Sequence, residues 1–212
     1  MEISDSVRLS IRDYLEQEYE SAMIHAGHAI EGTASKIYNK NTGSNYRFTT
    51  LLRDNYDIFG TVVMPGVDFA ASRFRVTLDN PKAPNGLPDI ADIIYGKHRC
   101  SHDHGQALPR EYEFIDGDGE FPCMYIGRDQ VKFSRRVILG MLLVAILSPV
   151  NSELACPKLD GIGIALGIDE QKWGLIINDW WGQAERFRTE ILPRFPEPKL
   201  VFDCSKIENQ PE

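Results

Sequence analysis

The sequence feature that most constrains the fold is a helical repeat of apolar residues near the N-terminus. Between Ser6 and Tyr38, apolar side chains recur at spacings of three and four, and no proline interrupts them. An α-helix gathers side chains with this spacing on one face, because it turns once in about 3.6 residues. Asp5 or Ser6 can cap the start. The repeat predicts one long helix over Ser6–Tyr38, with an apolar face buried against other helices.

Other segments carry the same helical pattern. The run VILGMLLVAIL predicts a buried helix from Arg135 to Leu147, which begins after Ser134 and ends before Pro149. This run is shorter than the roughly 20 residues that a membrane-spanning helix needs. Weaker patterns predict helices over Tyr46–Gly60, from Leu87 to Gly105, and over Trp180–Leu192. A chain of 212 residues with 42% hydrophobic residues can bury such helices as a single domain, residues 1–212.

Two stretches between the predicted helices are typical of β-strands. The segments EYEFID and FPCMYIG flank GDGE, and QVKF follows, which predicts a small hairpin or meander at about residues 110–133. The segment GIGIALGIDEQKWGLIIND predicts a second hairpin at about residues 160–178, although its pattern also fits a helix. We therefore expect a mainly α-helical (α+β) bundle of four to five helices with one or two small β-hairpin insertions.

Charge and cysteine content narrow the classes of function. The formal net charge is -8, which argues against a protein that coats nucleic acids non-specifically but leaves room for a local basic cleft. The four cysteines lie far apart and form no C-x-x-C pair, so we expect reduced thiols in a cytoplasmic protein. The N-terminus lacks the basic and apolar pattern of a signal peptide. We expect no membrane partner.

The stretch YGKHRCSHDHG, from Tyr95 to Gly105, holds three of the five histidines. His98 and His102 are four residues apart, a spacing that suits two ligands of a metal ion on one helix face. Further ligands would come from Cys100, Asp103 or His104, or from His25, His28 and Glu31 of the first helix. However, the fixed positive charge of Arg99 opposes a divalent cation at this place. We expect no metal and no cofactor, and keep a histidine-ligated metal protein as an alternative.

The same stretch contains an arginine followed at once by a polar residue, Cys100, and then by a histidine five positions after the arginine, His104. This pattern, at the C-terminal end of an apolar helix in a helical bundle, resembles the HEPN superfamily. The resemblance implies a HEPN-like helical bundle, often a metal-independent endoribonuclease. It also implies a homodimer through the motif-bearing face, with two motifs across one cleft. His102 offers a second register, R-x-x-H, for the same arginine.

The residue types suit RNA cleavage without a metal, in which the 2′-OH of RNA attacks the adjacent phosphate. Histidine can move the protons near neutral pH, and the arginine fork can stabilise charge on the phosphate oxygens. We therefore predict that Arg99 binds the phosphate and that His104 or His102 is the acid and base, with Cys100 positioning one of them. The residues expected to hold the RNA are Lys97, His98, Arg110, Arg135 and Arg136.

Two plainer interpretations of the cluster stay open. Histidine and arginine near the C-terminus of a helix interact favourably with the helix dipole, so the stretch could be a solvated helix end. It could also belong to a non-catalytic HEPN-like module that dimerises and binds a nucleotide or RNA. If the protein is a ribonuclease, the resemblance implies a role in stress response or in defence against foreign genetic elements.

Overall fold

The computed structural model describes residues 2–78, 81–83, 86–99, 114–115, 122–127, 130–166 and 173–203, with the backbone alone for residues 98, 99 and 173. These residues form a mainly helical structure with seven α-helices and two small antiparallel hairpins, which confirms the predicted class. The helices are α1 (Ile3–Leu15), α2 (Tyr19–Ile37), α3 (Ser44–Arg53), α4 (Tyr56–Val63), α5 (Ile90–Ile93), α7 (Arg136–Leu147) and α8 (Ala184–Glu190).

The prediction of one continuous helix over Ser6–Tyr38 is wrong, because the chain reverses between α1 and α2. Gln17 lies in the turn with a φ of 65°, a left-handed conformation that an α-helix does not contain. The two helices then pack side by side, and the Ser10 hydroxyl donates to the Ala22 carbonyl at 2.7 Å. The predicted helix over Tyr46–Gly60 is likewise divided, into α3 and α4.

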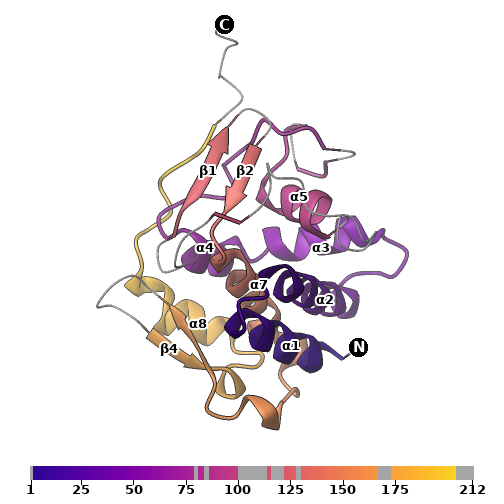
Figure 1. Ribbon diagram of the computed structural model, residues 1–212, viewed down its shortest axis with the longest axis vertical. Coiled ribbons are helices and arrows are strands. Elements are labelled where there is room, and N and C mark those ends of the chain that lie inside the picture. The colour runs from indigo at the N-terminus through magenta and orange to yellow at the C-terminus, as the bar shows by residue number, and fades with distance from the viewer. Residues whose placement is uncertain are drawn as a thin grey trace, which may run out of the picture.

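Helix α7 lies at the centre of the core, as its apolar sequence predicts. Every residue of α7 except Leu139 is buried, and the helix packs between α2 and α4. Figure 1 shows α7 in the middle of the molecule, between the β1–β2 hairpin and the region of β4 and α8. Just beyond α7, the buried Asn151 amide donates to the Thr33 hydroxyl at 2.9 Å and so joins this end to α2. None of the described helices has the length and apolarity to cross a bilayer.

The two hairpins lie within the stretches where hairpins are predicted. Strands β1 (Met124–Gly127) and β2 (Gln130–Phe133) pair antiparallel, and Ile115 adds a further backbone bond of 2.9 Å to Phe133. Strands β3 (Gly163–Leu166) and β4 (Trp173–Ile176) pair in the same way. The second stretch is therefore a hairpin and not a helix.

After α8 the chain returns along the region that follows α4. We call residues 195–203 the C-terminal strap. The backbone of Asp68 donates to the Leu200 carbonyl at 2.9 Å, and that of Arg73 donates to the Phe202 carbonyl at 2.8 Å. The Phe202 amide in turn donates to the Ser72 hydroxyl at 3.1 Å. These bonds fix the strap beside residues 66–73, a long-range pairing that the sequence pattern does not predict.

Candidate functional site

The predicted catalytic stretch begins on an unusual helix. Helix α5 continues without a break into a π-helical segment, η1 (Ile94–Arg99). A π-helix bonds residues five apart, and such turns within helices often occur at functional sites. The structure describes the backbone of His98 and Arg99 here, whereas the predicted site residues Cys100, His102, His104 and Arg110 lie outside the described residues.

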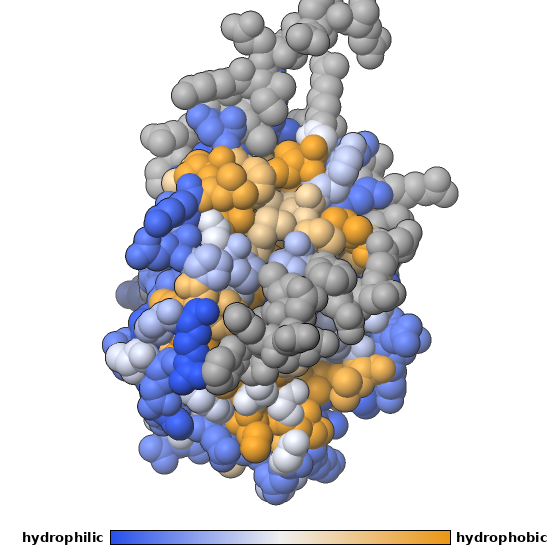
Figure 2. Space-filling view, turned by 90° about the vertical axis from the view of Figure 1, so that its left-hand side faces the viewer, coloured by the Kyte–Doolittle hydropathy of each residue, from blue (hydrophilic) through white to orange (hydrophobic). Residues whose placement is uncertain are grey.

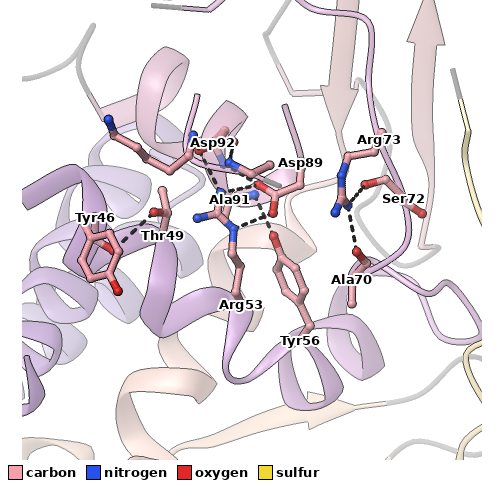
Figure 3. Close-up of polar contacts among 12 residues, drawn as sticks. Tyr46, Thr49, Arg53, Tyr56, Ala70, Ser72, Arg73, Asp89, Ala91 and Asp92 are labelled. Carbon is pink, nitrogen blue, oxygen red and sulfur yellow. Dashed lines mark hydrogen bonds and ion pairs between the residues drawn. The ribbon is translucent and has the colours of Figure 1, made fainter. Parts of the chain in front are cut away.

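An ion pair between α3 and the start of α5 anchors the helix that carries this stretch. The Arg53 Nε donates to Asp89 Oδ2 at 2.7 Å, and Nη2 donates to Asp89 Oδ1 at 2.9 Å. Asp89 also caps α5, since its Oδ1 accepts a hydrogen bond from the Asp92 amide at 3.0 Å. Figure 3 shows Arg53 pointing from its helix toward both carboxylates. Such a two-pronged pair fixes orientation as well as distance.

The second carboxylate of the anchor binds a neighbouring loop. Asp92 is 2.9 Å from Arg53 Nη2, and its two oxygens accept hydrogen bonds from the amides of Lys82 and Ala83 at 2.9 Å and 2.8 Å. Burial alone lowers the pKa of Arg53, but hydrogen bonding to Asp89 and the charges of both aspartates outweigh it and raise the pKa. Arg53 therefore stays charged inside the protein. The sequence does not reveal this partner, because no local pattern joins Arg53 to a helix start 36 residues away.

Two tyrosines hold α5 and the beginning of η1. The buried Tyr56 hydroxyl accepts a hydrogen bond from the Ala91 amide at 3.2 Å, and burial, with the charge of Asp89, raises the pKa of Tyr56 well above its usual value. The Tyr95 hydroxyl lies 2.8 Å from the Ser44 hydroxyl, at the start of α3. Segment η1 is thus fixed at its beginning by buried polar contacts, and Arg99 is its last residue.

The described residues among those predicted to bind RNA lie on two elements. Lys97 and His98 belong to η1, whereas Arg135 and Arg136 stand at the start of α7. The Arg135 guanidinium lies 4.0 Å above the Tyr19 ring, and its Nη1 donates to the Tyr19 hydroxyl at 3.0 Å. Arg136 is buried, and its Nε donates to the Val62 carbonyl at 2.6 Å.

A second polar cluster joins α1 to α2. The buried Asp13 accepts hydrogen bonds from the Ser21 hydroxyl at 2.6 Å and from Arg12 Nε at 2.7 Å, and His25 Nε2 lies 3.5 Å away. Burial raises the pKa of Asp13, but these hydrogen bonds outweigh it and lower the pKa. Burial lowers the pKa of His25 by more than Asp13 raises it, so the imidazole is neutral at pH 7.

The histidines considered as metal ligands on α2 lie close together. The rings of His25 and His28 are 6.1 Å apart, and the Nδ1 atoms of both are buried without a hydrogen-bond partner. Within the ranges that the structure covers, no three histidine, cysteine or acidic side chains are grouped to hold a metal ion. The ligands expected from residues 100–104 lie outside those ranges.

A cavity of about 400 Å³ lies between α4 and the C-terminal strap. Apolar groups such as Val67, Leu192 and Phe195 form most of its lining. Of its charged residues, Arg188 Nε donates to Asp57 Oδ2 at 2.6 Å, and Glu197 pairs with Lys199 at 2.9 Å. Figure 2 shows the side of the molecule that is on the left in Figure 1. Separate apolar patches lie there among hydrophilic residues. None of the residues that line the cavity belongs to the predicted motif.

Comparisons with known proteins place the chain in a family. The family described as Rv1289 matches residues 2–207. Similar proteins include the uncharacterized protein Rv1289 of Mycobacterium tuberculosis (strain H37Rv) and the uncharacterized protein Mb1320 of Mycobacterium bovis. Each is 32% identical over 191 residues, which cover 88% of this chain and 86% of the relative. No solved structure matches the chain. Because the match extends over nearly all of its length, the chain belongs to the Rv1289 family.

Proposed function

We propose that the protein is a metal-independent endoribonuclease of the HEPN type, with Arg99 binding the phosphate and His104 acting as acid and base. The observation that carries the proposal is the position of Arg99 at the end of a π-helical segment that continues from α5, whose start is anchored by the part-buried Arg53–Asp89 pair. Groups on a rigid element keep the geometry of a reaction better than groups on a loose loop.

The spacing of Arg99 and His104 calls for a winding other than that of an α-helix, or for two copies of the chain. In an α-helix, such residues point about 140° apart around the axis, because each residue turns the helix by about 100°. A π-helix instead bonds residues five apart and so brings them to neighbouring turns on one side. Arg99 ends a segment with this winding. The proposal takes His104 as the partner of Arg99 because their spacing of five positions matches the HEPN-like motif, and His102 stays the second register.

The proposed reaction needs only groups of the protein and of the RNA. His104 removes the proton from a ribose 2′-OH, the 2′ oxygen forms a bond to the adjacent phosphorus, and the bond from phosphorus to the 5′ oxygen breaks. The leaving 5′ oxygen takes the proton that His104 removed, and the products end in a 2′,3′-cyclic phosphate and a 5′-hydroxyl. Arg99 stabilises the charge that develops on the phosphate oxygens. Lys97, His98 and Arg110 contact the strand, and Cys100 positions Arg99 or His104.

The proposal includes a homodimer in which the motif-bearing faces of two copies form one cleft. The dimer rests first on the HEPN resemblance of residues 95–105. It rests also on the net charge of -8, because on an acidic protein RNA binds better in a confined basic cleft than on the general surface. Light scattering on the purified protein is expected to give twice the chain mass. If the protein is a monomer and still cleaves RNA, the proposed dimer is wrong and the proposed reaction stands.

The test is cleavage of a single-stranded RNA in the presence of EDTA. The unmodified protein is expected to cleave it, and His104→Ala and Arg99→Ala are each expected to cleave at least about 100-fold more slowly, since a general acid/base contributes about 10²–10⁴ in rate. His102→Ala is the matched control and should keep most of the activity. A chelator-resistant activity that His104→Ala retains in full would overturn the assignment, and RNA binding without cleavage would favour a non-catalytic module.

A further inference from the structure

The cavity between α4 and the C-terminal strap has the size of a small-molecule site. Its volume of about 400 Å³ is within the range of about 300–1,000 Å³ that is usual for ligand pockets. We call Tyr56, Thr61 and Val67 its floor, since these lining residues are only 9%, 6% and 4% exposed. The side chains of Asp57 and Arg188 are 36% and 29% exposed and so lie nearer to solvent, at its mouth. The cavity thus combines a buried floor with a charged mouth.

Two local structures keep a space between the strap and α4. At one end, the Gly66 carbonyl accepts a hydrogen bond of 2.9 Å from the Leu200 amide, and Gly66 itself has a φ of 88°, which side chains rarely tolerate. At the other end, the strap follows the short helix η6 (Leu192–Arg194), which packs against α4. Between these points, the rings of Pro196 and Pro198 fix the backbone φ. The strap is therefore a stiff segment tied at both ends, and the cavity exists before any ligand binds.

The donors at the cavity are already engaged within the protein. Arg188 Nε donates to Asp57 at 2.6 Å, Nη1 donates to Glu185 at 2.9 Å, and Nη2 donates to Asn55 at 3.1 Å. The Thr61 hydroxyl donates to the Asp57 carbonyl of its own helix at 2.8 Å. A carboxylate offers about four acceptor positions, and the hydrogen bonds recorded among the described residues bring only Arg188 to that of Asp57. The mouth therefore has acceptors to offer a ligand.

The charges at the mouth are mainly negative. Of the described lining residues, Asp57 and Glu197 are acidic and Arg188 is basic. Glu185 adds a further carboxylate beside Arg188, and Lys199 pairs with Glu197 at 2.9 Å. An anionic ligand would have to compete with Asp57 for Arg188, whereas an ammonium group would meet a carboxylate of opposite charge. The mouth therefore favours a cationic ligand.

We propose that this cavity binds a small organic amine, whose apolar body lies against Tyr56 and Phe195 and whose ammonium group donates to Asp57. The apolar walls give water few hydrogen-bond partners, so the body of the ligand displaces water at little cost. The bond to Asp57 is charge-assisted and fixes the orientation of the ligand. None of the lining residues belongs to residues 95–105, so this site goes beyond the proposed ribonuclease and does not depend on it.

Tryptamine is the probe, and indole-3-acetate is an anion with the same ring system. Isothermal titration calorimetry at constant ionic strength should show saturable binding of tryptamine, at least about tenfold tighter than that of indole-3-acetate. Asp57→Asn should weaken tryptamine binding at least about tenfold and remove most of this preference, because the amide keeps an acceptor for Arg188 but lacks the charge. Circular dichroism checks that the variant is folded.

Leu192→Trp tests the cavity without touching its charges. Leu192 lines the cavity from η6 and is only partly buried, so the larger ring should fill the space while the protein still folds. This variant should lose the binding of tryptamine. Undiminished binding would place tryptamine elsewhere on the protein and overturn the proposal.

Glu190→Gln is the matched control for Asp57→Asn, because it also removes the charge of an arginine's partner, the Arg186–Glu190 pair at 3.0 Å, but lies outside the cavity lining. It should keep the full affinity for tryptamine. A general attraction of cations to this acidic protein would weaken binding equally in both variants, and this result would overturn the proposal. So would the absence of saturable binding, or indole-3-acetate binding as tightly as tryptamine. None of these results would affect the proposed ribonuclease.

Discussion

Arg53 and Asp89 meet fork to fork, with Arg53 Nε 2.7 Å from one carboxylate oxygen and Nη2 2.9 Å from the other, although 36 positions separate them in the chain. Asp89 is also the cap of α5. The pair therefore fixes the start of the helix whose far end carries Arg99. The geometry of the proposed site depends on this joint, which can be tested without any activity assay.

Replacing Arg53 by methionine should destabilise the fold by about 3–5 kcal/mol, because the buried Asp89 and Asp92 lose their shared cation. Urea denaturation followed by circular dichroism measures the effect as a lower midpoint with an unchanged slope. Arg8→Met is the control, since Arg8 and Asp5 form a more exposed pair at 3.4 Å and its loss should cost at most about 1 kcal/mol. Equal costs for the two variants would show that the anchor is not structural.

Gly140 lets α4 approach α7 closely, and its replacement by alanine should destabilise the protein by about 1–3 kcal/mol. An added Cβ would lie 2.7 Å from the Val63 Cγ2 and 3.1 Å from the Phe59 ring. Gly27→Ala in α2 is the control, because its Cβ would meet nothing within 4 Å and alanine favours a helix by up to about 1 kcal/mol. Thermal unfolding should move the midpoints of the two variants in opposite directions. A stabilising Gly140→Ala would contradict the close packing.

Gln17→Gly should stabilise the protein by up to about 1 kcal/mol, because Gln17 adopts a left-handed backbone with a φ of 65°. Glycine takes that conformation without steric strain, although it also increases the entropy of the unfolded chain. Gln17→Ala keeps the strain and is expected to show no such gain. Denaturant midpoints of the three proteins give the comparison, and a glycine variant no more stable than the alanine variant would argue against strain in this turn.

His25 should make the fold less stable as the pH falls below neutrality. Burial lowers its pKa, the charges of His28, Arg12 and Arg8 lower it further, and Asp13 opposes them. The unfolded chain, where histidine titrates near 6.5, then binds a proton that the folded state does not. Stability rises with pH wherever the unfolded state holds more protons, so this contribution appears as a loss when the pH drops through about 6.5.

His25→Gln removes the titrating ring and keeps a group that can donate to Asp13. Its unfolding midpoint should fall less between pH 7.5 and about 5 than that of the unmodified protein. The titration of Asp13 does not contribute to the change in stability over this pH range. Its pKa is lowered, so its contribution is lost only as the pH falls below about 3.8 and through that lowered value. If the unfolding midpoints of both proteins fall equally over this pH range, His25 is not the cause of the loss of stability.

The sequence predicts the elements whose own composition decides their environment. The run from Val137 to Leu147 is so apolar that it must be buried, and it forms α7 at the centre of the core. The strand pairs appear where alternating residues flank turn residues. The reversal at Gln17 is missed, because the apolar spacing continues through it and neither glycine nor asparagine marks the left-handed position.

Long-range contacts explain what the sequence could not predict about the site. Spacing within residues 95–105 points to Arg99 and its histidines, but it gives no information on what fixes the helix beneath them. The aspartates of the segment PDIAD indicate a helix start in the sequence. That Arg53 is their partner depends only on how α3 packs. Arg135 and Arg136 are basic in the sequence, and only the tertiary structure shows that they donate to Tyr19 and to the Val62 carbonyl.

The ends of the RNA products test the proposed chemistry most directly. A short single-stranded RNA is incubated with the purified protein in EDTA, and mass spectrometry identifies the new termini. Attack by the 2′-OH predicts a 2′,3′-cyclic phosphate on one product and a 5′-hydroxyl on the other, with neither formed by His104→Ala. New 3′-hydroxyl and 5′-phosphate ends that appear only when Mg²⁺ is added would contradict it.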